Sequence, residues 1–235
     1  LYPAWGGLSN ALRSGKPESD AKDSQEGDDI FERLYSDPEK LKVFLGAMTG
    51  ISLGNAKEVA AKFPWNEYKT FCDVGTAQGA LAAEVAAAHP HLSGLGFDLA
   101  PVEPVFTEYV KSRGLSSRLK FQTGDFFKGD LPATDVLVMG HILHDWDLEQ
   151  KRMLVAKAHK ALNPGGALLV YDAMIDNERE KNAFGLLMSL NMLIETPGGF
   201  DYTQDDCATW LKEAGFKQIR FVPLTPTHTM AIGIK

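Results

Sequence analysis

The chain has 235 residues, 44% of them hydrophobic, which is enough to bury one substantial core. Its formal net charge of -7, with no block of lysine and arginine, argues against a nucleic-acid partner. Its two cysteines, Cys72 and Cys207, form neither a disulfide framework nor a metal-ligand cluster, which favours a reducing, cytoplasmic location. No apolar run reaches the roughly 20 residues that span a bilayer, so we also expect no membrane partner.

The first 66 residues are predicted to form a helical lead-in segment that packs on the domain after it. Helices are expected over residues 30–35 and 38–51, and the polar stretch 15–29 is typical of a solvated loop. The chain starts at Leu1 rather than at a methionine, and the apolar residues Tyr2 and Trp5 follow. We therefore expect that it begins within a longer protein.

From residue 67 onward, short apolar strands alternate with longer amphipathic helices. The predicted strands are 70–74, 94–99, 119–123, 135–139, 167–172, 218–224 and 229–234. The predicted helices are 79–88, 104–113, 148–162, 180–195 and 203–214. This alternation predicts an α/β fold with a seven-stranded, mostly parallel sheet and helices on both faces. Residues 225–228 are too few for a helical crossover, so the last two strands should form an antiparallel hairpin.

The turn after the first strand has the pattern of a nucleotide pocket. Gly75 and Gly79 let backbone N–H groups and a helix N-terminus approach a ligand, although such a turn can also be only a tight connection. Asp98 ends the second strand, where a carboxylate can accept hydrogen bonds from both ribose hydroxyls or cap a helix. A nicotinamide cofactor would satisfy this arrangement too. The spacing G-x-x-x-G, rather than G-x-G-x-x-G, favours a cofactor without pyrophosphate, and S-adenosylmethionine fits.

Two further segments follow strands at the edge where open α/β sheets bind ligands. Asp125 and Phe126 come after the third strand, where a carboxylate can accept from an adenine amino group and a ring can pack the base. The alternative for Asp125 is a solvated aspartate in a turn. His144 comes after the fourth strand and can act as a general base, because the ordinary pKa of histidine, about 6.5, lies close to the working pH. The alternative is a satisfied histidine at a helix start, and Trp146 is predicted to be core.

Six motifs occur in order along the chain: Asp73-Val74-Gly75 with Gly79, Phe97-Asp98-Leu99, Gly124-Asp125-Phe126-Phe127, His144-Asp145-Trp146, Pro164-Gly165-Gly166 and Pro197-Gly198-Gly199. Together they resemble the catalytic domain of the S-adenosylmethionine-dependent small-molecule O-methyltransferases. This family includes plant caffeic acid and hydroxyindole O-methyltransferases and many bacterial natural-product enzymes. The resemblance runs from about residue 5 to the C-terminus. It implies a Rossmann-like class I methyltransferase fold, with residues 67–235 as the cofactor-binding domain.

The resemblance also implies roles for individual residues. The implied cofactor contacts are Ser52, Gly75, Gly79, Asp98, Leu99, Asp125, Phe126, Gly140 and His141. His144 matches the catalytic base, and Asp172 and Asp201 stand where plant members have the flanking glutamates. Phe44, Met48, Asn191 and Met192 fall where the family lines its acceptor pocket. The turn Gly-Thr-Ala-Gln-Gly departs from the three consecutive glycines that are common in the family, but it keeps the outer pair.

The resemblance implies transfer of a methyl group to a hydroxyl, phenolic by expectation, of a small aromatic or natural-product acceptor. S-adenosylhomocysteine would be the product, and no metal is expected. Three alternatives stay open: hydroxylation, decarboxylation or pericyclic chemistry on the same fold, a nicotinamide-dependent oxidoreductase, and a non-catalytic cofactor-binding protein. Family members normally carry an N-terminal dimerisation domain that nothing here matches. We therefore expect a homodimer for the full-length protein and, for this fragment, an incompletely closed acceptor pocket. No role is assigned to His89, His91, His159 or His228.

Overall fold

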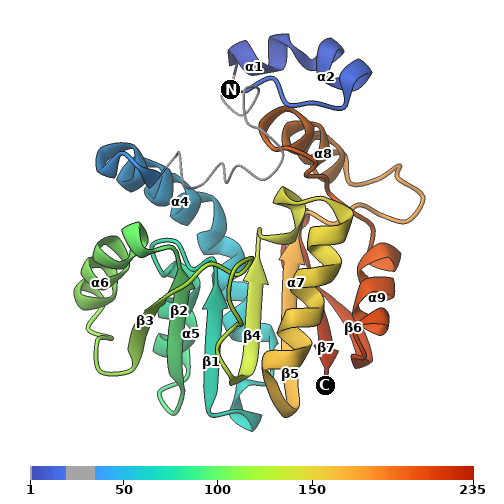
Figure 1. The fold of residues 1–235 in the computed structure, drawn as a ribbon. Coiled ribbons are helices and arrows are strands. Elements are labelled where there is room, and N and C mark those ends of the chain that lie inside the picture. The colour runs from blue at the N-terminus through green and yellow to red at the C-terminus, as the bar shows by residue number, and fades with distance from the viewer. Residues whose placement is uncertain (1, 20–34) are drawn as a thin grey trace.

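A seven-stranded sheet forms the centre of the molecule in a computed structural model that describes residues 2–19 and 35–235 (Figure 1). The strand order is β3-β2-β1-β4-β5-β7-β6. The strands are β1 (Thr70–Val74), β2 (Ser93–Asp98), β3 (Leu119–Thr123), β4 (Thr134–Gly140), β5 (Leu162–Asp172), β6 (Lys217–Pro223) and β7 (Thr229–Ile234). The first five strands pair in parallel, and β7 is antiparallel to both β5 and β6. The α/β fold and the C-terminal hairpin are confirmed.

Both faces of the sheet are apolar because helices cover both faces. Neighbouring residues of one strand point to opposite sides, so Leu137 and Val138 of β4 belong to different hydrophobic clusters. One cluster contains Val85 of α5, and the other contains Leu154 of α7. The helices of this region are α5 (Ala80–Ala88), α6 (Glu103–Ser112), α7 (Leu148–Ala161), α8 (Ala183–Glu195) and α9 (Gln204–Glu213), with short 3-10 turns η2 (Trp65–Glu67), η3 (Ala100–Val102) and η4 (Leu143–Asp145).

Helix α4 (Pro38–Lys62) is longer than the sequence predicted. Asp37 caps its start by accepting hydrogen bonds from the N–H groups of Glu39 and Lys40. The prediction ended the helix at residue 51, whereas the structure continues it through Gly54 to Lys62. Buried residues of its second half, such as Val59, pack into the same cluster as α5. Tertiary packing therefore outweighs the low helix propensity of glycine here.

Two short helices at the N-terminus, α1 (Tyr2–Gly6) and α2 (Leu8–Ser14), pack on α8 and lie farthest from the sheet in Figure 1. Trp5 Nε1 donates a hydrogen bond of 3.0 Å to Asn191 Oδ1 of α8. The predicted helix 30–35 and most of the predicted loop 15–29 lie outside the described residues. Helix α8 begins at Ala183 rather than at residue 180, because Asn182 caps it. Among the described helices, none combines the length and apolar character needed to cross a membrane.

Gly140 marks a tight contact between two neighbouring strands. It pairs with Tyr171 of β5, and an added Cβ would overlap the Tyr171 ring. We expect Gly140→Ala to lower the free energy of unfolding by about 1–3 kcal/mol, because the packed ring or the strand must move. Urea unfolding measures this. Gly129→Ala is the matched control, since its Cβ would lie 3.6 Å from the nearest atom, and it should change stability by less than about 0.5 kcal/mol. Equal effects of the two substitutions would contradict the prediction.

Candidate active site

The turn between β1 and α5 requires glycine at its two outer positions. Gly75 and Gly79 have φ angles of 68° and 88°, in the left-handed region that favours glycine. A Cβ at Gly75 would overlap Ile142, and one at Gly79 would lie 2.7 Å from the Phe106 ring. Gly75 N–H also donates a 2.8 Å hydrogen bond to the carbonyl of Phe97. The turn is thereby held against the end of β2.

Asp98 at the end of β2 braces this turn. Its Oδ2 accepts a 2.9 Å hydrogen bond from Ala77 N–H, and its Oδ1 accepts one of 2.8 Å from Leu99 N–H. Ala77 has a φ of 50°, so the Asp98 contact holds an alanine in a conformation that costs an L-residue about 1–2 kcal/mol. The sequence left open that Asp98 caps a helix, but η3 has Leu99 at its N-cap and no side-chain cap. Asp98 is instead buried, and its carboxylate holds the turn by accepting hydrogen bonds from two backbone N–H groups.

Asp73 lies at the start of the turn and was named from the sequence only as part of a motif, without a role of its own. Its Oδ2 accepts a 2.8 Å hydrogen bond from Thr76 Oγ1. Burial raises the pKa of Asp73 to about 7, and the neighbouring charge of Asp98 adds to the shift. The sequence feature that could have pointed to Asp73 is a charged residue among the buried residues of β1.

Asp125 and Phe126 follow β3 as predicted. Asp125 Oδ1 accepts a 2.8 Å hydrogen bond from Phe127 N–H, and Lys128 Nζ lies 3.0 Å from its Oδ2. Asp125 therefore closes its own turn, and its side chain is only 15% exposed rather than solvated. The half-buried Phe126 ring packs edge-on against Trp146, with 5.7 Å between the ring centroids. Trp146 is buried in the core, as expected.

His144 lies in η4, just beyond the carboxyl end of β4, and is 7% exposed. Its Nδ1 lies 3.4 Å from Asp201 Oδ1 and 3.9 Å from Asp172 Oδ1. Asp172 ends β5, and Asp201 follows a glycine turn that packs directly on η4: a Cβ at Gly199 would lie 2.7 Å from the His144 carbonyl. The structure thus brings together the three residues predicted for proton transfer, from three separate segments.

The charge around His144 favours its protonated form. Burial opposes the imidazolium, but the carboxylates of Asp172, Asp145 and Asp201 together raise the pKa of His144 to about 10. The nearest oxygen of Asp145 lies 3.6 Å from His144 Nε2. Burial, offset in part by His144, raises the pKa of Asp172 to about 7.

Two side chains that the sequence analysis missed support this cluster. Tyr202 donates a 2.5 Å hydrogen bond to Asp172 Oδ2. Lys151 of α7 is fully buried, with its ammonium donating to the Trp146 carbonyl and lying 3.6 Å from the centre of the Phe200 ring. Burial lowers the pKa of Lys151 to about 8, against the attraction of the neighbouring carboxylates, Asp172 foremost. The available signal was a lysine at helical spacing from Leu154 and Ala158, on the apolar stripe of α7.

His141 precedes η4 and adopts a φ of 54°. Its Nδ1 lies 3.9 Å from Asp172 Oδ1, and its ring packs edge-on against His228 at 5.0 Å. Burial and the charges of His144 and His228 lower the pKa of His141. His228, to which the sequence assigned no role, is buried and lies next to His141. The fold also brings ligand atoms of His141, His144 and Asp172 within 4.8 Å of one another. The sequence did not reveal this group of metal-ligating side chains.

The four residues predicted for the acceptor pocket lie on two helices, α4 and α8. Phe44 and Met48 are half-buried on α4, and Phe44 packs against the same buried cluster, around Leu41 and Leu45, as Ala77 of the turn between β1 and α5. Asn191 of α8 instead accepts from Trp5 and donates to Glu195 Oε2 at 3.0 Å.

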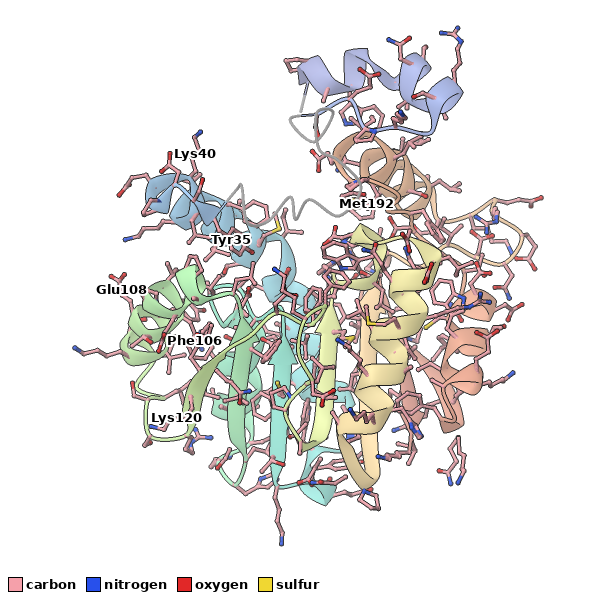
Figure 2. The ribbon with its side chains drawn as sticks, in the orientation of Figure 1. Tyr35, Lys40, Phe106, Glu108, Lys120 and Met192 are labelled. Atoms are coloured by element: carbon pink, nitrogen blue, oxygen red, sulfur yellow. The ribbon has the colours of Figure 1, made fainter. Side chains whose placement is uncertain are left out.

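Met192, the fourth residue, is buried on the side of α8 toward the sheet (Figure 2). Ser52, a predicted cofactor contact, is half-buried on α4. Nearby, Thr49 of α4 donates a 2.9 Å hydrogen bond to Gln78 of the turn. Helix α4 therefore contacts the turn between β1 and α5, whereas Met192 lies on α8, the helix that contacts η4.

Comparison with known proteins identifies the family. The sequence model of the O-methyltransferase domain matches residues 5–217. TcmO of Streptomyces glaucescens, a tetracenomycin polyketide synthesis 8-O-methyl transferase, is 44% identical over 235 residues, covering 100% of this chain and 68% of TcmO. The N,N-dimethyltransferase OxyT of Streptomyces rimosus is 37% identical over 216 residues, covering 92% of this chain and 62% of OxyT.

A solved structure agrees with these sequence relatives. Human N-acetylserotonin methyltransferase in complex with S-adenosylmethionine has a TM-score of 0.90 at 27% identity, covering 100% of this chain and 67% of that one. All three relatives are methyltransferases, which favours methyl transfer over the nicotinamide alternative. The family match, together with the turn and strand-end motifs, shows that this chain belongs to the S-adenosylmethionine-dependent O-methyltransferases.

Proposed function

We propose that this chain methylates a phenolic hydroxyl of an aromatic, polyketide-like acceptor, with His144 as the general base. The observation that carries the proposal is the position of the His144 imidazole, whose Nδ1 faces Asp201 and Asp172 at the carboxyl end of the sheet. Nε2 is then the nitrogen that accepts the proton of the acceptor. The carboxylates fix the tautomer and stabilise the imidazolium that forms.

The described residues fit S-adenosylmethionine, which when bound supplies an electrophilic methyl group on a sulfonium. The left-handed backbone of Gly75 and Gly79 forms a turn at the carboxyl end of β1, and α5 begins directly after it, an arrangement that suits a nucleotide-like ligand. Asp98 has its two oxygens oriented by backbone N–H groups at the end of β2, the position from which a carboxylate accepts hydrogen bonds from ribose hydroxyls. The buried carboxylates of Asp172 and Asp201 favour a cationic ligand nearby. We propose Ser52, Leu99, Asp125, Phe126, Gly140 and His141 as further cofactor contacts.

The electrostatics of the cluster favour a phenol as the proton donor. The carboxylates beside His144 stabilise its imidazolium, and a phenol, with an ordinary pKa of about 10, is acidic enough to give its proton to a histidine held in this way. An aliphatic hydroxyl would be a much weaker acid. TcmO is named for O-methylation and OxyT for N,N-dimethylation, so both acceptor atoms occur among the relatives.

The test is a mass-spectrometric assay with S-adenosylmethionine and paired acceptors. Each pair consists of one polycyclic aromatic scaffold carrying either a phenol or an amine at the same position. Methylation of the phenols alone supports the proposal. Methylation of the amines alone would overturn the choice of acceptor atom while leaving the family membership intact.

Asp98→Ala should weaken binding of S-adenosylhomocysteine at least tenfold. Two hydrogen bonds to a charged acceptor contribute roughly 1.5–3 kcal/mol each, and the substitution also removes the brace on Ala77. Isothermal titration calorimetry measures the affinity. Asp130→Ala is the matched control for loss of a carboxylate, because Asp130 pairs with Lys160 in solvent and is not among the proposed cofactor contacts, and it should leave the affinity nearly unchanged. Unchanged affinity in Asp98→Ala would refute the pocket.

A further inference from the structure

Several buried polar atoms around His144 have no hydrogen-bond partner among the described residues. They include His144 Nδ1, Asp172 Oδ1 and both carboxylate oxygens of Asp201. Leaving such an atom unpaired costs about 1–3 kcal/mol, and more when the group is charged. Atoms of this kind, gathered at one point, indicate a ligand that the protein is built to hold.

The same point has the donor atoms of a metal site. Ligand atoms of His141, His144 and Asp172 all lie within 4.8 Å of one another. Asp172 Oδ1 is 3.9 Å from Nδ1 of each histidine. Tetrahedral zinc, with bonds of about 2.0–2.2 Å, places neighbouring ligand atoms roughly 3.4 Å apart. Each of the two pairs that Asp172 forms therefore needs to close by about half an ångström, and the pair of histidines by at most about 1.4 Å. His141 is partly exposed and provides access from solvent.

The outer partners of these side chains also suit a metal. Tyr202 holds Asp172 Oδ2 with its hydroxyl, which leaves Oδ1 directed toward the histidines. Asn55 lies 3.5 Å from His141 Nε2, and the amide oxygen of Asn55 is buried without a donor. A half-turn of this amide would let Oδ1 accept from His141 Nε2–H. That tautomer leaves the lone pair on His141 Nδ1, the atom that faces Asp172.

The local charge favours a divalent cation. Three carboxylates, those of Asp145, Asp172 and Asp201, surround His144, whereas Lys151 provides one ammonium. The carboxylates outnumber the ammonium by two, and a metal ion that binds the imidazoles displaces their ring protons. Two imidazole nitrogens and one carboxylate oxygen form a donor set that suits zinc.

We propose that His141 Nδ1, His144 Nδ1 and Asp172 Oδ1 bind Zn²⁺, and that the bound ion switches off the proposed methyl transfer. A metal on Nδ1 takes that lone pair, so the one remaining ring proton of His144 sits on Nε2. Nε2 then donates a hydrogen bond and no longer accepts the proton of a phenol. The inhibition rests on the proposed function, whereas the binding does not.

The experiment titrates the metal-free protein with zinc chloride, without cofactor or acceptor, by isothermal titration calorimetry. One ion per chain is expected, with two nitrogen ligands in the zinc-edge X-ray absorption spectrum. His141→Ala should weaken binding more than tenfold, because loss of even an outer-shell partner costs about 10–100-fold. His228→Gln is the matched control: it removes an imidazole that packs on His141 but whose Nδ1 is bonded to Thr227, and it should leave affinity within about twofold.

Equal affinities of the wild type and His141→Ala would overturn the proposal, as would the absence of one-to-one binding or a spectrum without nitrogen ligands. If circular dichroism shows that His141→Ala does not fold, Tyr202→Phe replaces it as the test of the metal site. Tyr202→Phe should weaken zinc binding about tenfold or more. Unchanged zinc affinity in this variant would overturn the site. Zinc binding by a protein that methylates no acceptor would refute the proposed function and leave the metal site standing.

Discussion

Replacing His144 with glutamine is expected to lower kcat/KM for methyl transfer by about 10²–10⁴-fold, the usual contribution of a general base. Glutamine keeps the size and polarity of the side chain but accepts no proton. Steady-state kinetics with a phenolic acceptor measure the loss, and calorimetry should show nearly unchanged affinity for S-adenosylhomocysteine. His91→Gln, at an exposed histidine elsewhere on the surface, is the control and should keep the wild-type rate. A wild-type rate in the His144 variant would assign the base to another group.

The same substitution has a readout that needs no acceptor. The pKa of His144 is raised in the folded protein, to about 10 from its ordinary 6.5. The resulting stabilisation is fully present below pH 6.5 and is lost as the pH rises toward 10. Urea unfolding of the wild type and of His144→Gln should therefore show a larger stability difference near pH 6 than near pH 10. A difference that does not depend on pH would show that the carboxylates do not stabilise the imidazolium.

Lys151→Met should lower the free energy of unfolding by about 3–5 kcal/mol near neutral pH, as expected when one partner of a buried charge cluster is removed. Methionine fills a similar volume, so the loss is electrostatic: the carboxylates of Asp172, Asp201 and Asp145 lose the one buried ammonium beside them. Urea unfolding measures the change. Lys160→Met on the same helix is the control, because Lys160 pairs with Asp130 in solvent and such pairs contribute about 0–1 kcal/mol. Equal losses for the two variants would contradict this account.

Most of the sheet could be predicted from the sequence, because local signals were enough. The strands around β1 and β4 are short apolar runs bounded by turn residues, and the short link before β7 allowed only a hairpin. The end of α4 was missed because Gly54 is a poor helix former, and only contacts with α5 show why the helix continues. Boundaries that depend on distant packing are not present in a local pattern.

In the candidate site, too, the residues within a recognised motif could be predicted, and those defined by distant packing could not. The resemblance predicted His144, Asp172 and Asp201, and the structure brings them together. Lys151 and Tyr202 were missed because their importance depends on which side chains they meet across the fold, and neither belongs to a recognised motif. Phe44 matched a family position that lines the acceptor pocket, and that role stays a prediction.

The turn between β1 and α5 also indicates which residues a sequence search for distant relatives should require. Glycine is obligatory only at Gly75 and Gly79, where Ile142 and Phe106 occupy the space of a Cβ. Ala77 shows that the middle of the turn accepts a side chain when an aspartate at the end of β2 holds its N–H. A search profile that demands three consecutive glycines would discard such chains. One that pairs two separated glycines with that aspartate would retain them, and it would rest on steric necessity rather than on frequency.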